Sequence, residues 1–187
     1  MEYVDGGSLS QRAGEIPFEQ TLWTAFSVTK GIRHAHKMGV AHLDLKPQNI
    51  LFRSIDDAWD VPKVADWGPS KQLLNHSQSV EGMPPHHAAP EQFDTDAFGQ
   101  TDTVTDVYQL GAVLYELFTG RPPFDGDTFE VINKIQSSDP VPPNEVADLA
   151  TGIDEILLTA LTTEKGDRYE DVLSIRDALQ ALWDDHQ

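Results

Sequence analysis

The chain has 187 residues, with 13 basic and 31 acidic side chains, so its formal net charge is −18. This length favours one domain with a sizeable core, and this charge excludes a nucleic-acid-binding protein because two polyanions repel each other. The absence of cysteine excludes disulfides, thiolate metal sites and a cysteine nucleophile.

Carboxylates spread along a chain that keeps 39% hydrophobic residues favour a halophilic protein, because concentrated salt screens self-repulsion. An ordinary acidic protein is the alternative. The longest apolar stretch, residues 107–118, is interrupted by polar residues and is too short to cross a bilayer. The first residues also lack the basic and apolar sections of a signal peptide. We therefore expect a soluble, cytoplasmic protein that does not contact a membrane.

The first half of the chain alternates one helical pattern with short apolar runs. Residues 1–9 combine an apolar run with a Gly-Gly turn, which is typical of a strand end leading into a linker. Apolar residues spaced by three and four predict a helix over 17–38, with Gly39 as its stop. Residues 67–102 show no sustained period. Short apolar runs predict strands at 39–41, 50–52 and 61–65.

The second half of the chain is predicted to be helical. A strong pattern over 104–118, closed by Thr119 and Gly120, is apolar on most of its surface and predicts a central, buried helix. Further helices are expected near 127–136, 152–162 and 171–183, with a proline-rich break at 140–143. The predicted fold is mainly α with a few short strands, that is, α+β.

Three short motifs follow one another in the middle of the chain. They are HLDLKPQN at 42–49, DWG at 66–68 and APE at 89–91. Here the chain resembles the C-terminal lobe of the serine/threonine protein kinase family, whose signatures HRDLxxxN, DFG and APE occur in this order. Leu43 replaces the arginine of the first motif, and Trp67 replaces the phenylalanine of the second.

The resemblance extends over almost the whole chain and implies one kinase-like domain over 1–187. It implies that Asp106 braces the loop and that Arg168 pairs with Glu91 of the APE motif. The implied parts of the lobe are a hinge at 1–9, a catalytic loop at 42–49, an activation segment at 66–91 and a central buried helix at 103–119.

The resemblance also implies roles for single residues. Asp44 would act as the catalytic base that accepts or orients the proton of a substrate hydroxyl, and Lys46 would reach the transferred phosphoryl group. Asn49 and Asp66 would hold magnesium, which prefers hard oxygen ligands. Any one of these residues alone could be an ordinary solvated side chain. Together, at the family spacing, they favour a phosphoryl-transfer site.

The resemblance implies ATP and magnesium as cofactors and a protein as substrate. The hinge match suggests that backbone groups of Glu2 and Val4 meet the adenine, with Met1 at the gatekeeper position. Leu51 would form part of the floor beneath the base.

Three further features depart from the family pattern. The 187 residues contain no Gly-x-Gly-x-x-Gly motif and no strand lysine in the family context, so we expect the N-terminal lobe to be absent. Met83 replaces a threonine whose hydroxyl would bridge Asp44 and Lys46, and one extra residue precedes Ala89.

These departures leave three hypotheses open. The first is a partial serine/threonine protein kinase domain that transfers the γ-phosphoryl group of ATP and obtains its N-lobe from a longer chain or from a separate partner chain. The second is a catalytically inactive, kinase-like scaffold that binds other proteins. The third is a gene fragment that does not fold stably. Self-association through the face where the N-lobe would sit is a further expectation.

Overall fold

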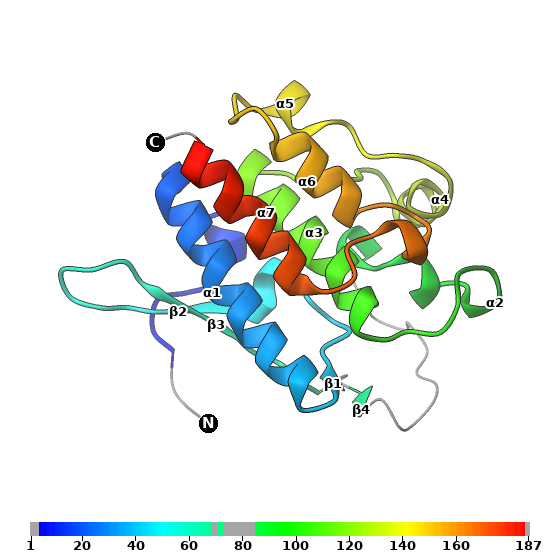
Figure 1. Ribbon diagram of the computed structural model, residues 1–187, viewed down its shortest axis with the longest axis horizontal. Helices are drawn as coiled ribbons and strands as arrows, with labels where there is room; N and C mark the ends of the chain where they lie inside the picture. Colours follow the sequence, from blue (N-terminus) through cyan, green and yellow to red (C-terminus); the bar gives the residue numbers. More distant parts are fainter. Residues whose placement is uncertain (1–3, 69–70, 73–84, 186–187) are drawn as a thin grey trace.

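The structure, a computed structural model, describes residues 4–68, 71–72 and 85–185 (Figure 1). Seven helices occur in this part of the chain: α1 (Phe18–Lys37), α2 (Thr95–Phe98), α3 (Thr103–Thr119), α4 (Thr128–Ser137), α5 (Pro143–Val146), α6 (Ile153–Ala160) and α7 (Val172–Asp185). Four short strands accompany them: β1 (Val40–Ala41), β2 (Ile50–Arg53), β3 (Val61–Val64) and β4 (Lys71–Gln72). The predicted class, mainly α with a few short strands, is confirmed.

The helix α3 lies at the centre of the core, as its sequence predicts. The side chain of Asp102 caps its start by accepting from the amide of Val104 at 2.8 Å. Its end is set by Gly120, which adopts the left-handed conformation at φ 78°. Almost every residue between is buried, because α3 contacts α1, α5, α6 and α7 around its circumference. A helix apolar on all sides is thereby removed from water.

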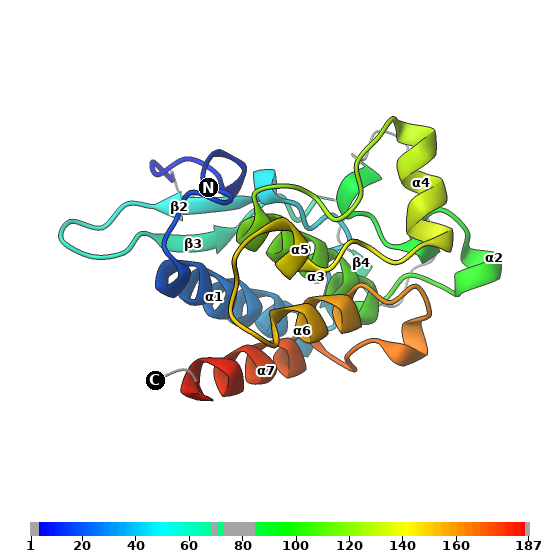
Figure 2. The same cartoon turned by 90° about the horizontal axis from the view of Figure 1, so that it is seen from above.

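The helix α1 lies between the β2–β3 hairpin and α7, which Figure 2 shows as three successive layers. Pro17 occupies its N-cap, and Gly39 follows its end at φ 74°. Its buried residues recur at three- and four-residue spacing, as an amphipathic helix requires. They include Leu22, Ala25, Val28 and Ile32.

The strands form two separate antiparallel pairs. In one pair β2 and β3 align Ile50 with Val64, and in the other β1 and β4 align Val40 with Gln72. The three predicted strands are therefore present, and β4 is an addition. The β2–β3 pairing continues past the strands, since the amide of Ala65 donates to the carbonyl of Asn49 at 2.8 Å. This register fixes the position of the segment after β3 relative to the segment before β2.

Two sequence predictions differ from the structure. The proline-rich stretch separates α4 from α6 as expected, but its last residue, Pro143, begins the additional short helix α5, in whose first turn a missing N–H is not needed. The strand end expected within 1–9 is not a strand in residues 4–9, where Ser8 makes one isolated bridge with Leu51 before the 3-10 turn η1 (Leu9–Gln11). Residues 1–3 lie outside the described part. Within the described chain, no helix combines the length and apolarity needed to cross a bilayer.

Candidate active site

A buried carboxylate on α3 holds the loop of residues 42–49, which we call the 42–49 loop. Asp106 is fully buried and accepts from the amide of His42 at 2.7 Å and from the amide of Leu43 at 2.8 Å. Its Oδ2 also lies 2.7 Å from Nε2 of His36 on α1. These bonds satisfy amides that have no strand partner, and they hold Leu43 at φ 64°, a conformation uncommon for a residue with a side chain. The bracing expected of Asp106 is confirmed.

Two glutamines extend this support, and the sequence reasoning missed both. The amide of Leu45 donates to Oε1 of Gln109 at 3.1 Å. The Nε2 of Gln109 donates in turn to Gln92 at 2.8 Å, and Nε2 of Gln92 donates to the carbonyl of Leu43 at 3.0 Å. The one available signal was the position of Gln109, a polar residue inside an otherwise apolar helix. A buried glutamine requires partners, and here the loop provides them.

Three of the predicted site residues contact one another within the 42–49 loop. The Nζ of Lys46 lies 2.9 Å and 3.2 Å from the two carboxylate oxygens of Asp44. The Nδ2 of Asn49 donates to the backbone carbonyl of Asp44 at 2.8 Å and to its Oδ2 at 3.1 Å. Asp44 is nine-tenths buried, so its charge is balanced by Lys46 rather than by water. The cluster is a carboxylate fixed in position by a cation and an amide.

Asp66 lies at the neighbouring end of the β2–β3 hairpin. It follows β3 by two residues, is exposed and adopts φ 58°. Because Ile50 pairs with Val64 and Asn49 bonds to Ala65, the hairpin places Asp66 at the same end as Asn49. The structure therefore brings the fourth predicted residue to this end of the fold.

The donor set suits a magnesium ion that also binds phosphate oxygens. The Nδ2 of Asn49 donates to Asp44, and no described residue donates to its Oδ1, so that oxygen is available as a metal ligand. Asp66 adds an exposed carboxylate. In the described ranges, no three His, Cys, Asp or Glu side chains converge as a metal cage. Magnesium commonly takes one or two protein oxygens together with substrate phosphates, so such a cage is not required.

Trp67, the residue after Asp66, is accommodated at this position with its indole N–H hydrogen-bonded. Trp67 packs on the ring of His42 with centroids 4.5 Å apart, and its indole N–H donates to the carbonyl of Val64 at 3.1 Å. The Nε2 of His42 lies 3.0 Å from the carbonyl of Ala65. The larger ring at this position therefore ties the start of the 42–49 loop to the end of β3.

The residues proposed to meet a nucleotide base are only partly described. Leu51, on β2, is half-buried beside Ser8, and Val4 is half-buried at the start of the described chain. Met1, Glu2 and Met83 lie outside the described residues. The segment that follows Val4 is held on β2, because the amide of Gly6 donates to the carbonyl of Phe52 at 2.7 Å.

We expect Gly6→Ala to weaken this attachment and to lower the free energy of unfolding by about 1–3 kcal/mol. A Cβ on Gly6 would lie 2.5 Å from the carbonyl oxygen of Phe52, and the backbone would have to move away. Urea denaturation would measure the loss. Gly166→Ala is the matched control, because nothing lies within 4 Å of its added Cβ. Equal stability of the two variants would contradict the close packing at Gly6.

The APE motif is joined to a distant arginine by a fully buried ion pair. Glu91 accepts from the two terminal nitrogens of Arg168 at 2.8 Å and 2.9 Å, and neither side chain is exposed. The pairing expected from the sequence is confirmed. Thr105 donates to the same carboxylate, and the guanidinium lies over the ring of Tyr108. Burial raises the pKa of the Tyr108 phenol, so this ring is uncharged beside the pair.

Two histidines before the APE motif anchor the segment to different elements. His87 is buried, and its Nε2 lies 2.7 Å from Glu116 on α3. His86 points to a different partner, with Nδ1 3.1 Å from the carbonyl of Phe124. Their separate partners show that adjacent histidines in the sequence do not converge on one site. They fix residues 85–91 against α3 and its exit.

Comparison with known proteins gives concordant matches. A family model described as the protein kinase domain matches residues 1–183. A probable serine/threonine-protein kinase of Clostridium perfringens is 34% identical over 97% of this chain, which spans 27% of that relative. Serine/threonine-protein kinase PknB of Mycolicibacterium smegmatis is 33% identical over 94% of this chain and 29% of the relative. PknB of Mycobacterium leprae is 31% identical, with the same coverage. The chain thus spans less than a third of the length of these relatives.

Proposed function

The chain belongs to the protein kinase family, and on this premise we propose that it carries the catalytic loop of a serine/threonine protein kinase. The proposed reaction transfers the γ-phosphoryl group of ATP to a hydroxyl group of a protein substrate. The names of its relatives support serine and threonine as acceptors. The observation that carries the proposal is the contact of Asp44 with both Lys46 and Asn49.

Asp44 would orient the acceptor hydroxyl and receive its proton. The acceptor oxygen forms a bond to the γ-phosphorus while the bond to the bridging oxygen breaks, and the electron pair of that bond leaves with ADP. The proton passes from the hydroxyl to Asp44 and then to solvent. Such reactions need positioning and charge neutralisation more than covalent help. Burial of Asp44 among bonds from Lys46 and Asn49 supports a fixed position for its carboxylate.

Lys46 would supply positive charge beside the transferred group. Its Nζ lies within hydrogen-bond distance of Asp44, and its flexible side chain would turn from that carboxylate to a phosphoryl oxygen bound beside it. Asn49 and Asp66 would hold magnesium through their oxygens. Bound there, the ion would neutralise phosphate charge.

The remaining parts of the proposal concern the binding of the nucleotide base, the roles of two segments and the partner of the protein. We place the adenine against backbone groups of Glu2 and Val4 and above Leu51, with 1–9 as hinge and 66–91 as activation segment. The partner is a protein substrate. A cytoplasmic location and a salt-rich source stay predictions from the sequence.

A kinase-like binding module without catalysis is the second candidate. Lys46 engages both oxygens of Asp44, the same atoms that an acceptor hydroxyl would need. Met83 also replaces the threonine whose hydroxyl would bridge Asp44 and Lys46 in the family pattern. If Lys46 never leaves Asp44, the loop has the shape of a catalytic site without its function.

Magnesium dependence separates the two candidates. We expect the endogenous protein, isolated at its natural length and with any bound partner chain, to transfer label from [γ-³²P]ATP to casein. Excess EDTA should reduce transfer to background, and added Mg²⁺ should restore it, because phosphate charge is otherwise unneutralised. Phosphoamino-acid analysis would identify the acceptor. The absence of transfer with Mg²⁺ present would favour the binding module.

A further inference from the structure

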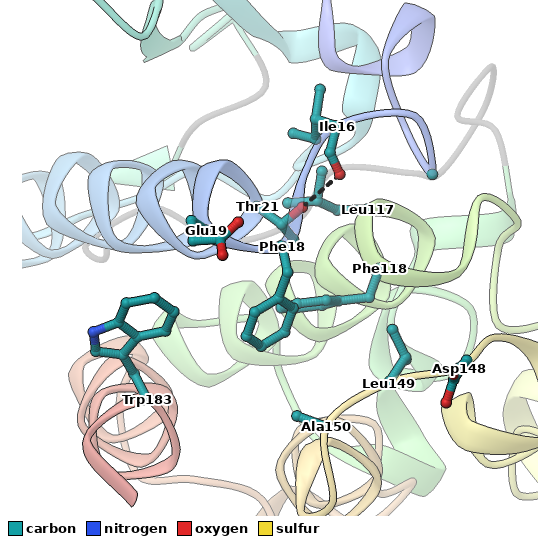
Figure 3. Close-up of a pocket in the computed structure, with 11 residues that line it drawn as sticks. Ile16, Phe18, Glu19, Thr21, Leu117, Phe118, Asp148, Leu149, Ala150 and Trp183 are labelled. Carbon is teal, nitrogen blue, oxygen red and sulfur yellow. Dashed lines mark hydrogen bonds between the residues drawn. The ribbon is translucent and has the colours of Figure 1, made fainter. Parts of the chain in front are cut away.

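A pocket lies at the ends of α1 and α3 that are remote from the 42–49 loop. Its volume is about 510 Å³, which falls within the usual range for small-molecule sites. Figure 3 shows its wall built from the start of α1, the end of α3, the loop before α6 and the last turns of α7. The lining residues with aromatic or charged side chains are Phe18, Glu19, Phe118, Asp148 and Trp183.

The pocket is separate from the proposed phosphoryl-transfer site. On α3, Phe118 lies 12 residues beyond Asp106, which corresponds to about 18 Å at 1.5 Å per residue. On α1, Phe18 lies 18 residues before His36, or about 27 Å. The two helices that hold the 42–49 loop at one end therefore line this pocket at the other.

Aromatic rings form much of the pocket wall. The rings of Phe18 and Phe118 lie 5.9 Å apart at 48°, and Trp183 lies 6.4 Å from Phe18. In Figure 3 the two phenylalanine rings meet at the centre, with Trp183 on one side and Leu149 and Ala150 on the other. Ring faces carry a negative quadrupole that attracts cations. Trp183 and Phe18 are both half-buried, so each keeps part of its ring accessible.

Two carboxylates flank the rings on opposite sides. Figure 3 shows Glu19, a residue of α1, above the ring of Trp183, and Asp148 beyond Leu149. Both are exposed, and neither has an ion-pair partner within 4.0 Å among the described residues. Their charges make the electrostatic potential at the pocket more negative. The ring faces and the net charge of −18 on the whole chain act in the same direction.

The pocket offers little to an anion. The hydroxyl of Thr21, which lines it, donates to the carbonyl of Pro17 at 3.1 Å. The indole nitrogen of Trp183 lies on the side of the ring turned away from Phe18 (Figure 3). No lysine or arginine lines the wall within the described chain. Carboxylates and phosphates would therefore lose hydration there without gaining a cationic side chain.

We propose that this pocket binds a small organic cation with an apolar body, of the alkyl- or aryl-ammonium class. The apolar body would displace water from the rings of Phe18, Phe118 and Trp183, and the ammonium group would face Glu19 or Asp148. Both interactions favour a positive ligand over a neutral one of the same shape. This binding site is independent of the proposed kinase activity.

Three probes of similar shape and different charge test the proposal on the full native chain. They are 2-phenylethylammonium, 2-phenylethanol and 3-phenylpropionate. The readout is the ¹H–¹⁵N indole cross-peak of Trp183, assigned by its loss in Trp183→Phe. In dilute salt we expect the ammonium probe to shift this cross-peak with an affinity about tenfold above that of the alcohol. The propionate should leave the peak unmoved.

The double variant Glu19→Gln/Asp148→Asn identifies the source of the charge preference. It should bring the ammonium and alcohol affinities within about threefold, since the shape of the pocket is kept. The matched control, Asp139→Asn/Glu170→Gln, removes two carboxylates elsewhere and should retain the tenfold preference. Equal binding of all three probes, no shift of the Trp183 peak, or a preference unchanged in the double variant would overturn the proposal. The far-UV circular dichroism of both variants checks that they fold.

Discussion

Asp44→Asn should lower the rate of phosphoryl transfer by about 10²–10⁴-fold, the range that a positioned general base contributes. The substitution keeps the size of the side chain and the donation from Asn49 to the backbone of residue 44. It removes the negative charge, so the side chain can no longer accept a proton from the acceptor hydroxyl. It also leaves Lys46 without its ion-pair partner.

The rate should be measured with the endogenous chain under saturating Mg·ATP and an excess of acceptor protein, so that chemistry rather than binding is compared. Asp139→Asn serves as the control, because this exposed carboxylate makes no described contact with the 42–49 loop. Urea denaturation of both variants separates lost chemistry from lost folding. Transfer by Asp44→Asn at the rate of the unaltered protein would show that Asp44 is not the base.

Arg168→Ala should lower the free energy of unfolding by about 3–5 kcal/mol. Both members of the Arg168–Glu91 pair are fully buried, and the pair joins segments 77 residues apart in the chain. Removing the guanidinium leaves the Glu91 carboxylate in a dry site with only Thr105 as a donor among the described residues. It also deprives the carbonyls of Thr162 and Thr163 of their partner.

Arg176→Ala is the matched control for this result. Arg176 also pairs with an acid, Asp177, but its side chain is 37% exposed, and we expect a change within about 0.5 kcal/mol. Urea midpoints with slopes measured for each variant give the two values. The apolar double replacement Glu91→Leu/Arg168→Met should recover much of the loss, because no buried charge is left unpaired. A small effect of Arg168→Ala would mean that water reaches Glu91.

Much of the helical framework could be predicted because its causes are local. Apolar spacing and flanking proline and glycine residues set α1, and the cap residues Asp102 and Gly120 set α3. The short helix α5 was missed because a proline-rich stretch usually indicates a break, although Pro143 is compatible with a first turn. Local sequence patterns therefore predict the ends of long helices better than they predict single helical turns such as α5.

The candidate site shows the same division between local and distant causes. Asp44, Lys46 and Asn49 lie within six residues, so one motif was sufficient to group them. The link from Leu43 through Gln92 to Gln109 joins three segments, and neither glutamine has a sequence pattern that identifies its partner. The aromatic pocket was missed for the same reason, since Phe18 and Trp183 come from opposite ends of the chain.

The attachment of the 42–49 loop to Asp106 has a consequence for folding. The amide of His42 and its acceptor are 64 residues apart, so their bond forms only after a long segment of chain has closed. The left-handed backbone of Leu43 is not stabilised before that closure, because the Asp106 carboxylate offsets its strain. The shape of the loop therefore depends on the packing of α3 against α1, and we expect the native arrangement of Asp44 to be lost wherever that packing is lost.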